Sequence, residues 1–182
     1  MATDQELKDK WHDLLFGVRR SARYHVLRRE FFDRLGFFTN FLIIITGGGT
    51  VIAVGHESHH ILAMCLGVLV ALFSAIDLIV GCSRAARDHH DLARDFIELE
   101  KKLISDEANP TTDKLIEYTA KRLEIEKEEP PKLCALDLLC YDELVKAGGY
   151  PPNESHQFSW YHRTFAHFFD INARGIKKLK DC

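Results

Sequence analysis

The sequence predicts an all-α membrane protein: a two-span transmembrane helical hairpin with helical cytoplasmic extensions and a C-terminal helical region. Two apolar runs, residues 35–54 and 61–82, lie close together, and each has the roughly 20 residues that a helix needs to cross a hydrocarbon core of about 30 Å. The turn at residues 55–60 is too short to recross the bilayer, so both ends of the chain are expected on one side. Lysine and arginine flank the outer ends of the runs and are absent from the turn, which places that side in the cytoplasm.

A helical hairpin buried inside a soluble protein is the alternative interpretation of these runs. The chain has 182 residues, and the sequence outside the runs is too short to cover two fully apolar helices, so we favour the membrane. The first run follows 34 mostly polar residues and has no small-residue cleavage pattern, so we expect an anchor and not a signal peptide. The predicted topology is therefore multi-pass, with both termini cytoplasmic.

Residues 1–34 are expected to form a cytoplasmic amphipathic helix that runs without a break into the first span. No proline occurs between Asp4 and Val54, and apolar side chains recur at helical spacing. This stripe consists of Leu7, Trp11, Leu14, Val18 and Ala22.

Residues 83–108 are expected to form a second cytoplasmic helix, which continues from the second span and ends before Asn109-Pro110. Its apolar stripe consists of Leu92, Phe96, Leu99 and Leu103. Two amphipathic extensions that leave the same hairpin would bury their stripes against each other, so we expect them to pack antiparallel.

The C-terminal region, residues 109–182, is predicted to begin with a helix that Thr111 or Thr112 caps and Pro130-Pro131 stops. Asp113 lies in its first turn, where a carboxylate is favourable. Its inward side chains are expected to be Leu115, Tyr118 and Leu123.

Two more helices follow. One runs from Leu133 to about Ala147, where Gly148-Gly149 ends it, and the loop from Tyr150 to Ser155 comes next. The last, from Phe158 to about Lys178, is rich in aromatic residues and has a basic end. That composition fits two uses, a helix at an anionic membrane surface or a helix that packs on the cytoplasmic part. The packing side chains would be Trp160, Phe165, Phe168 and Phe169.

Small and polar residues within the spans recur at steps of three and four, so each span has one face on which another backbone can approach. The predicted pore-lining or helix-packing residues are Thr39, Asn40, Ile43, Thr46, Thr50, Ser74 and Asp77. Close helix packing is expected at Gly47, Gly67, Ala71 and Gly81. The basic residues at the membrane boundary are Arg28, Arg29, Arg34, Arg84 and Arg87.

Asp77 is the single formal charge within the runs, and a carboxylate in hydrocarbon costs roughly 2.5 to 3.5 kcal/mol on insertion scales. Protonation, a hydrogen bond to Asn40 or Thr39, or a water-filled lumen would each offset this cost. The competing interpretation is a boundary acid that reaches the cytoplasmic headgroups near Arg84 and Arg87.

Two helices alone cannot surround an aqueous path, so conduction would require a homo-oligomer. A stripe of threonines with Asn40 is suited to line water, and Ile43 would narrow the passage. The same stripe is equally suited to join helix to helix.

Other chemistries find little support in the sequence. His56, Glu57, His59 and His60 crowd the turn, but we expect no metal there, and the sequence calls for no cofactor. A solvated helical face is likewise expected for Asp88, His89, His90 and Asp91. No catalytic motif or phosphate-binding loop is recognisable, so we expect no enzyme, and the near-neutral charge gives no nucleic-acid footprint. The odd number of cysteines favours reduced thiols.

A basic amphipathic helix, Trp11 to Arg34, thus leads into a two-span hairpin with a very short turn, and a charged helix, Arg84 to Leu103, follows. This order of elements resembles the SLATT domains, two-transmembrane effectors associated with nucleotide-second-messenger systems of bacterial conflict. The resemblance is architectural and covers about the first two thirds of the chain. It implies a bacterial inner-membrane defence protein that oligomerises and forms a pore when a partner signals.

The predicted function is therefore an oligomeric channel-like or pore-forming effector, gated by its cytoplasmic helices. The alternative is a membrane-anchored oligomeric scaffold or sensor that recruits a partner without conducting. The predicted partners are the lipid bilayer, further copies of the chain, and a cytoplasmic protein or a component of a nucleotide-signalling system.

Overall fold

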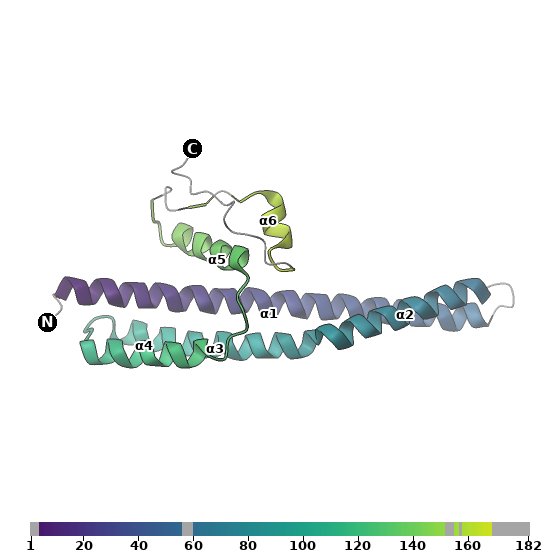
Figure 1. The fold of residues 1–182 in the computed structure, drawn as a ribbon, viewed down its shortest axis with the longest axis horizontal. Coiled ribbons are helices and arrows are strands. Elements are labelled where there is room, and N and C mark those ends of the chain that lie inside the picture. The colour runs from purple at the N-terminus through teal and green to yellow at the C-terminus, as the bar shows by residue number, and fades with distance from the viewer. Residues whose placement is uncertain (1–3, 56–59, 152–154, 157, 169–182) are drawn as a thin grey trace. The chain divides into compact units, whose positions relative to one another are not determined.

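The structure is a computed structural model that describes residues 4–55, 60–151, 155–156 and 158–168. The elements in these ranges are α-helices, which confirms the predicted all-α class (Figure 1). The chain divides into two compact units, one formed by Arg28–His89 and the other by Met1–Leu27 with His90–Cys182. We call the first the hairpin unit and the second the helical unit.

Helix α1, Asp4–Val54, is one uninterrupted helix of 51 residues, as the absence of proline predicts. It contributes its residues up to Leu27 to the helical unit and its later residues to the hairpin unit. No proline interrupts it and its apolar residues keep a helical spacing, so nothing in the sequence ends the helix before Gly55.

The hairpin unit pairs the second part of α1 with α2, His60–Val80, and with the start of α3, Cys82–Asp106 (Figure 1). The expected continuous helix from the second span into residues 83–108 is interrupted at one residue. Gly81 has a φ of +60°, a conformation that glycine adopts without the steric cost that a Cβ brings. The helix therefore stops at Val80 and restarts at Cys82.

Helices α1 and α2 are each long and apolar enough to cross a membrane, as judged by length and composition alone. Only 11% of the apolar segment of α1 and 0% of that of α2 is buried within the protein. Core helices of soluble proteins bury most of their apolar surface, so this pair lacks the cover that such a core would give it.

The helical unit has two apolar clusters. The first joins α1, α3 and α4, Thr112–Glu126, and contains the predicted residues Trp11, Leu14, Val18, Ala22, Leu92, Phe96, Leu99, Leu103 and Tyr118. Trp11 and Tyr118 meet edge to face with their ring centroids 5.8 Å apart. Both predicted stripes therefore lie in one core.

The cap of α4 is Thr111, whose side chain accepts a hydrogen bond from the backbone N–H of Lys114. The prediction that Leu123 faces inward is wrong, because its side chain is exposed, while Ile125 is buried. Each residue turns a helix by about 100°, so Leu123 lies about 140° around the axis from Tyr118, whereas Ile125 returns to the face of Tyr118.

The second cluster joins α1 to α5, Cys134–Ala147, and to α6, Trp160–Phe165. The bounds of α5 agree with the prediction to within a residue. The last helix differs from its prediction, because α6 has six residues and residues 166–168 form a turn. The remainder of the expected helix, up to Lys178, lies outside the described residues.

Candidate functional site

Two glycines of α1 lie close to the other helices of the hairpin unit, Gly36 to the start of α3 and Gly49 to α2. A Cβ added to Gly36 would lie 3.2 Å from the Cβ of Cys82, and one added to Gly49 would lie 3.2 Å from Cδ1 of Leu66. These two contacts fix an antiparallel register, since residue numbers rise along one helix as they fall along the other. Counted from these contacts, Asn40 lies within about one turn of the level of Asp77, as the sequence predicts.

Close packing within the hairpin does not occur at the predicted glycines Gly47 and Gly67. A Cβ at either position would meet no atom within 4 Å, and the small residue Ala71 is exposed. The same holds for Gly81, whose role is instead the backbone conformation that separates α2 from α3. The sequence pattern predicted the small-residue face of α1 on which Gly36 lies, but it did not name Gly36 or Gly49 as positions of close packing.

The threonines of α1 lie along the seam of the hairpin. Thr39 and Thr46 are buried and Thr50 is half-buried. Each hydroxyl donates to a carbonyl one turn earlier in its own helix: Thr39 to Leu35 at 2.9 Å, Thr46 to Leu42 at 2.6 Å and Thr50 to Thr46 at 2.8 Å. These bonds satisfy the hydroxyls without water and without a second helix.

The remaining polar residues of the predicted stripe have a different environment. Asn40 and Ser74 are exposed, and Asp77 is half-buried, as is Ile43. Among the described residues, no side chain forms a hydrogen bond or ion pair with the carboxylate of Asp77. Thr39, one of its two expected partners, donates to Leu35 instead. Within one hairpin, the described residues offer no side-chain hydrogen-bond partner to Asn40, Ser74 or Asp77.

Basic residues gather at the end of the hairpin where Gly36 meets Cys82. The predicted boundary residues Arg28, Arg29 and Arg34 precede that level on α1, and Arg84 and Arg87 follow it on α3. The guanidinium of Arg28 lies 4.5 Å from the ring centroid of Phe32, and Arg34 forms an ion pair with Glu30 at 3.2 Å. A cation over an aromatic ring at the edge of an apolar run matches the chemistry of a membrane interface.

His89 departs from the expected solvated face. Its side chain is buried and stacks on Phe32, with ring centroids 5.6 Å apart and an angle of 12° between the planes. His90 and its neighbours Asp88 and Asp91 are exposed, as expected. The difference arises because position 89 continues the buried face that begins with Cys82 and Ala86, at steps of four and three residues.

The helical unit contains a buried polar cluster that the sequence did not reveal. Nε2 of His25 lies 2.9 Å from Oε1 of Glu129, and Oε2 of Glu129 lies 2.9 Å from Nζ of Lys132. Nζ of Lys132 also donates to Oγ of Ser21 at 3.1 Å. Burial by itself raises the pKa of Glu129, but the hydrogen bonds from His25 and Lys132 outweigh it and hold the pKa of this carboxyl below its ordinary value.

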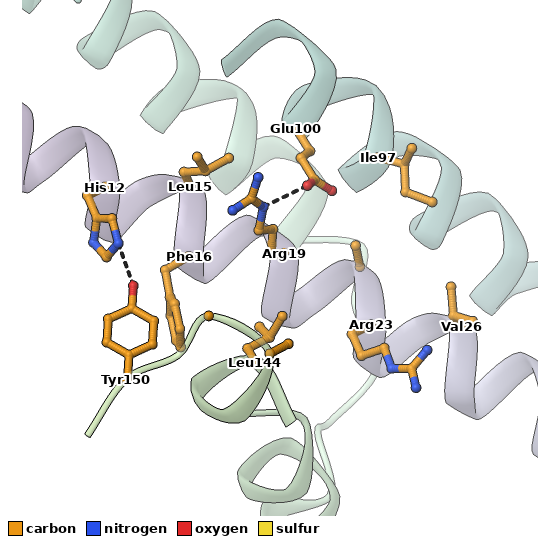
Figure 2. A pocket seen from close by; sticks show the side chains of 13 residues that line it. His12, Leu15, Phe16, Arg19, Arg23, Val26, Ile97, Glu100, Leu144 and Tyr150 are labelled. Carbon is orange, nitrogen blue, oxygen red and sulfur yellow. Dashed lines mark hydrogen bonds and ion pairs between the residues drawn. The ribbon is translucent and has the colours of Figure 1, made fainter. Parts of the chain in front are cut away.

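A cavity of about 620 Å³ opens between α1, α3 and the end of α5 in the same unit. Figure 2 shows that His12, Phe16 and Tyr150 gather at one end of it, and that Arg19 and then Arg23 follow along α1. The hydroxyl of Tyr150 lies 2.6 Å from Nε2 of His12, and Phe16 meets the Tyr150 ring edge to face. Nε of Arg19 donates to Glu100 at 2.8 Å and Nε of Arg23 donates to Glu143 at 2.9 Å.

The sequence did not single out these cavity residues. Arg19 and Arg23 are four positions apart on one helix, and Phe16 precedes Arg19 by three, so helical spacing alone places the three side chains on neighbouring turns. Glu100, Leu144 and Tyr150 come from distant parts of the chain, and only the fold brings them to the same place.

Two predictions about the C-terminal region and the turn have different outcomes. Trp160, Phe165 and Phe168 are exposed, so of the two uses left open for this segment, packing on the helical unit is contradicted for these three; Phe169 lies outside the described residues. The turn residues His56, Glu57 and His59 also lie outside the described residues. Within the described ranges, no group of three histidine, cysteine or acidic side chains could hold a metal ion.

Cys82 and Cys140 are buried, Cys65 and Cys134 are exposed, and all four are free thiols. Comparison of the chain with protein-family models, with curated proteins and with solved structures found no match.

Proposed function

We propose that this chain is a homo-oligomeric, non-enzymatic membrane protein whose hairpins assemble into a pore or channel controlled by the helical unit. The observation that carries the proposal is the uncovered apolar surface of the hairpin. Ile44, Leu78 and Ile79 are at least 73% exposed, and large apolar side chains are exposed along both helices. An apolar surface of this extent needs lipid or further copies of the chain to cover it.

Assembly into an oligomer is supported by the polar groups that one hairpin leaves without partners. Asn40 is exposed five residues inside the first apolar run, and no described residue forms a hydrogen bond with its side-chain amide. An amide that faces hydrocarbon without a partner costs several kcal/mol, on the order of 4 or more. A second hairpin or a water-filled lumen would satisfy Asn40, and Ser74 and Asp77 in the same way.

The lumen that we propose is therefore lined by Asn40, Ser74 and Asp77, while Thr39 and Thr46 are buried within one hairpin and donate within α1. The basic end of the hairpin, with Arg28, Arg34, Arg84 and Arg87, would lie at the cytoplasmic surface of the inner membrane. Both termini would then be cytoplasmic, and the helical unit would be placed where it can control the pore.

The resemblance to SLATT domains supports the same proposal from the order of the elements. It adds a role in bacterial defence, in which a cytoplasmic signal opens the pore and the open pore damages the membrane. The signalling partner would be a protein or a component of a nucleotide-signalling system.

A second candidate function is a membrane-anchored scaffold, in which the hairpins only associate and the helical unit recruits a partner. One observation favours it: the hydroxyls of Thr39, Thr46 and Thr50 donate to backbone carbonyls of α1, so they do not need water as a hydrogen-bond acceptor. In this candidate, Asn40, Ser74 and Asp77 would join neighbouring hairpins by hydrogen bonds and enclose no lumen.

Ion flux from liposomes that contain the purified protein tests the choice between these functions. A pore lined by Asp77 should conduct, and Asp77→Asn should change the ratio of cation to anion permeability severalfold, because it removes one charge per subunit from the lumen. The matched control is Asp88→Asn, an exposed acid outside the apolar runs, which should leave this ratio unchanged.

Liposomes that stay impermeable under a range of activating conditions, with the protein correctly inserted, would contradict the pore and favour the scaffold. Association of hairpins is tested separately by Asn40→Ala. We expect the dissociation constant of the oligomer to rise roughly 5- to 30-fold in detergent, which corresponds to about 1–2 kcal/mol. Ile45→Ala is the control, because this exposed apolar side chain lies about 140° around the helix axis from Asn40.

A further inference from the structure

We propose that the cavity between α1, α3 and the end of α5 binds a small organic acid with an apolar, ring-bearing body. The cavity volume of about 620 Å³ lies within the range of small-molecule sites in proteins. The inference is independent of whether the hairpin conducts, because every residue of the cavity belongs to the helical unit.

The two arginines of the cavity, Arg19 and Arg23, have hydrogen-bond donors that the described part of the protein does not use. Arg19 and Arg23 each use Nε for one glutamate, at 2.8 and 2.9 Å, and these bonds orient the guanidinium groups. Their Nη groups form no hydrogen bond with the described residues, so two forks of N–H donors remain for an external acceptor. Arg19 is paired with Glu100 and Arg23 with Glu143, so a bound acid would be held by hydrogen bonds from these Nη groups and not by a net positive charge.

One end of the cavity suits an apolar ring. The rings of Phe16 and Tyr150 meet at 88° with centroids 6.1 Å apart, and the hydroxyl of Tyr150 is held by His12 at 2.6 Å (Figure 2). The rest of the wall is largely aliphatic, with Leu15, Ala22, Val26, Ile97 and Leu144. Aromatic and aliphatic walls with a few convergent polar groups are the usual composition of a ligand site.

The position of the charged groups defines the ligand class more closely. Because Arg19 and Arg23 follow the rings along α1, the ligand should carry its ring toward His12 and Tyr150 and its acid group on the side of the arginines (Figure 2). A carboxylate or a phosphate would each fit the arginine forks. A neutral molecule of the same shape would lack the charged contact, and a simple anion would lack the apolar one.

The test is equilibrium dialysis of 2-naphthoate against the full chain in nanodiscs, with empty nanodiscs to subtract partition into lipid. We expect saturable binding of one molecule per chain. The neutral 2-naphthamide and acetate should each bind at least 10-fold more weakly, since each lacks one half of the recognition. Inorganic phosphate and acetate are compared as competitors, which shows which acid group the site prefers.

Variants on two different elements locate the binding. The double variant Arg19→Gln, Arg23→Gln should weaken 2-naphthoate binding at least 10-fold without weakening 2-naphthamide binding. Ala147→Phe places a ring into the cavity from an exposed position on α5 and should abolish the binding of both probes. Arg94→Gln is the matched control, because Arg94 is an exposed, ion-paired arginine of the same unit that does not line the cavity.

Thermal unfolding midpoints within a few degrees of the wild-type value would show that the variants retain the fold. The proposal is overturned if 2-naphthoate fails to bind at millimolar concentration, if the amide binds as well as the acid, or if Arg94→Gln weakens binding as much as the double variant. Phosphate as the better competitor would assign a phosphate ester, and acetate as the better competitor would assign a carboxylic acid.

Discussion

Nε2 of His25 lies 2.9 Å from Oε1 of Glu129, and both side chains are almost completely buried in the helical unit. The two residues are 104 positions apart, so this contact joins α1 to the segment between α4 and α5. Lys132 completes the cluster through the other carboxylate oxygen at 2.9 Å. A buried carboxylate with two such partners stabilises the fold only while it is ionised.

Glu129→Gln should destabilise the helical unit by about 1.5–3 kcal/mol, because the charge-assisted hydrogen bonds become neutral ones. The measurement is denaturant unfolding followed by helical circular dichroism at neutral pH. Glu128→Gln is the matched control, since the neighbouring side chain is 70% exposed and pairs weakly with Lys127 at 3.7 Å. Equal effects of the two substitutions would contradict a structural role for the buried cluster.

The same cluster predicts a pH dependence. Because the pKa of Glu129 is lower in the folded chain than its ordinary value of 4.5, the folded state binds fewer protons than the unfolded state below that pH. The stabilisation is therefore complete above about pH 4.5 and is lost as the pH falls through the folded pKa. The loss of stability between pH 5 and 3 should be smaller in Glu129→Gln than in the wild type.

The backbone conformation of Gly81 leads to a prediction about the stability of the hairpin unit. Its φ of +60° lies in the left-handed region, where a residue with a Cβ costs roughly 1–2 kcal/mol. Gly81→Ala should therefore destabilise the hairpin unit by about 1 kcal/mol, or convert α2 and α3 into one continuous helix. Gly67→Ala is the control, because it lies inside α2 with open space at the Cβ and should stabilise the helix slightly. A neutral or stabilising effect of Gly81→Ala without added helix content would contradict the break.

The two cysteines of α5, Cys134 and Cys140, should differ in the reactivity of their thiols. Burial, followed by the nearby charges of Glu143 and Asp137, raises the pKa of Cys140 to about 12, whereas Cys134 is exposed. The thiolate is the reactive species, so a maleimide should label Cys134 at least 100-fold faster than Cys140 at pH 8. Mass spectrometry of peptides from briefly labelled native protein measures the two rates. Similar rates would show that α5 does not pack on α1 as described.

The elements that were predicted correctly are those with a local cause. The length of α1 follows from the absence of proline, the cap at Thr111 from its side chain, and the bounds of α5 from the prolines before it and the glycines after it. The buried stripe from Trp11 to Ala22 follows from helical spacing alone.

The elements that were not predicted depend on contacts between distant residues. Nothing near Glu129 in the sequence indicates that His25 is its partner. Gly81 and Gly47 are the same residue type, but of the two only Gly81 has a positive φ. The cavity of the helical unit is likewise formed from three segments, so its aromatic and basic residues come together only in the fold. Within the apolar runs, composition identified the polar residues, but the packing of the two helices decided that Thr39 is buried and Asn40 exposed.

The register of the hairpin can be tested directly through the contact of Gly36 with Cys82. A Cβ at residue 36 would lie 3.2 Å from the Cβ of Cys82, within a few tenths of an ångström of the roughly 3.5–4.5 Å that a disulfide requires. In a chain that keeps Cys82 as its only native cysteine, Gly36→Cys should therefore form an intramolecular disulfide on mild oxidation, seen as a loss of two mass units. Gly47→Cys in the same background should remain reduced within one chain, because no atom lies within 4 Å of its Cβ. Crosslinking of residue 47 but not of residue 36 to Cys82 would require a different pairing of the two helices and would move Asn40 away from the level of Asp77.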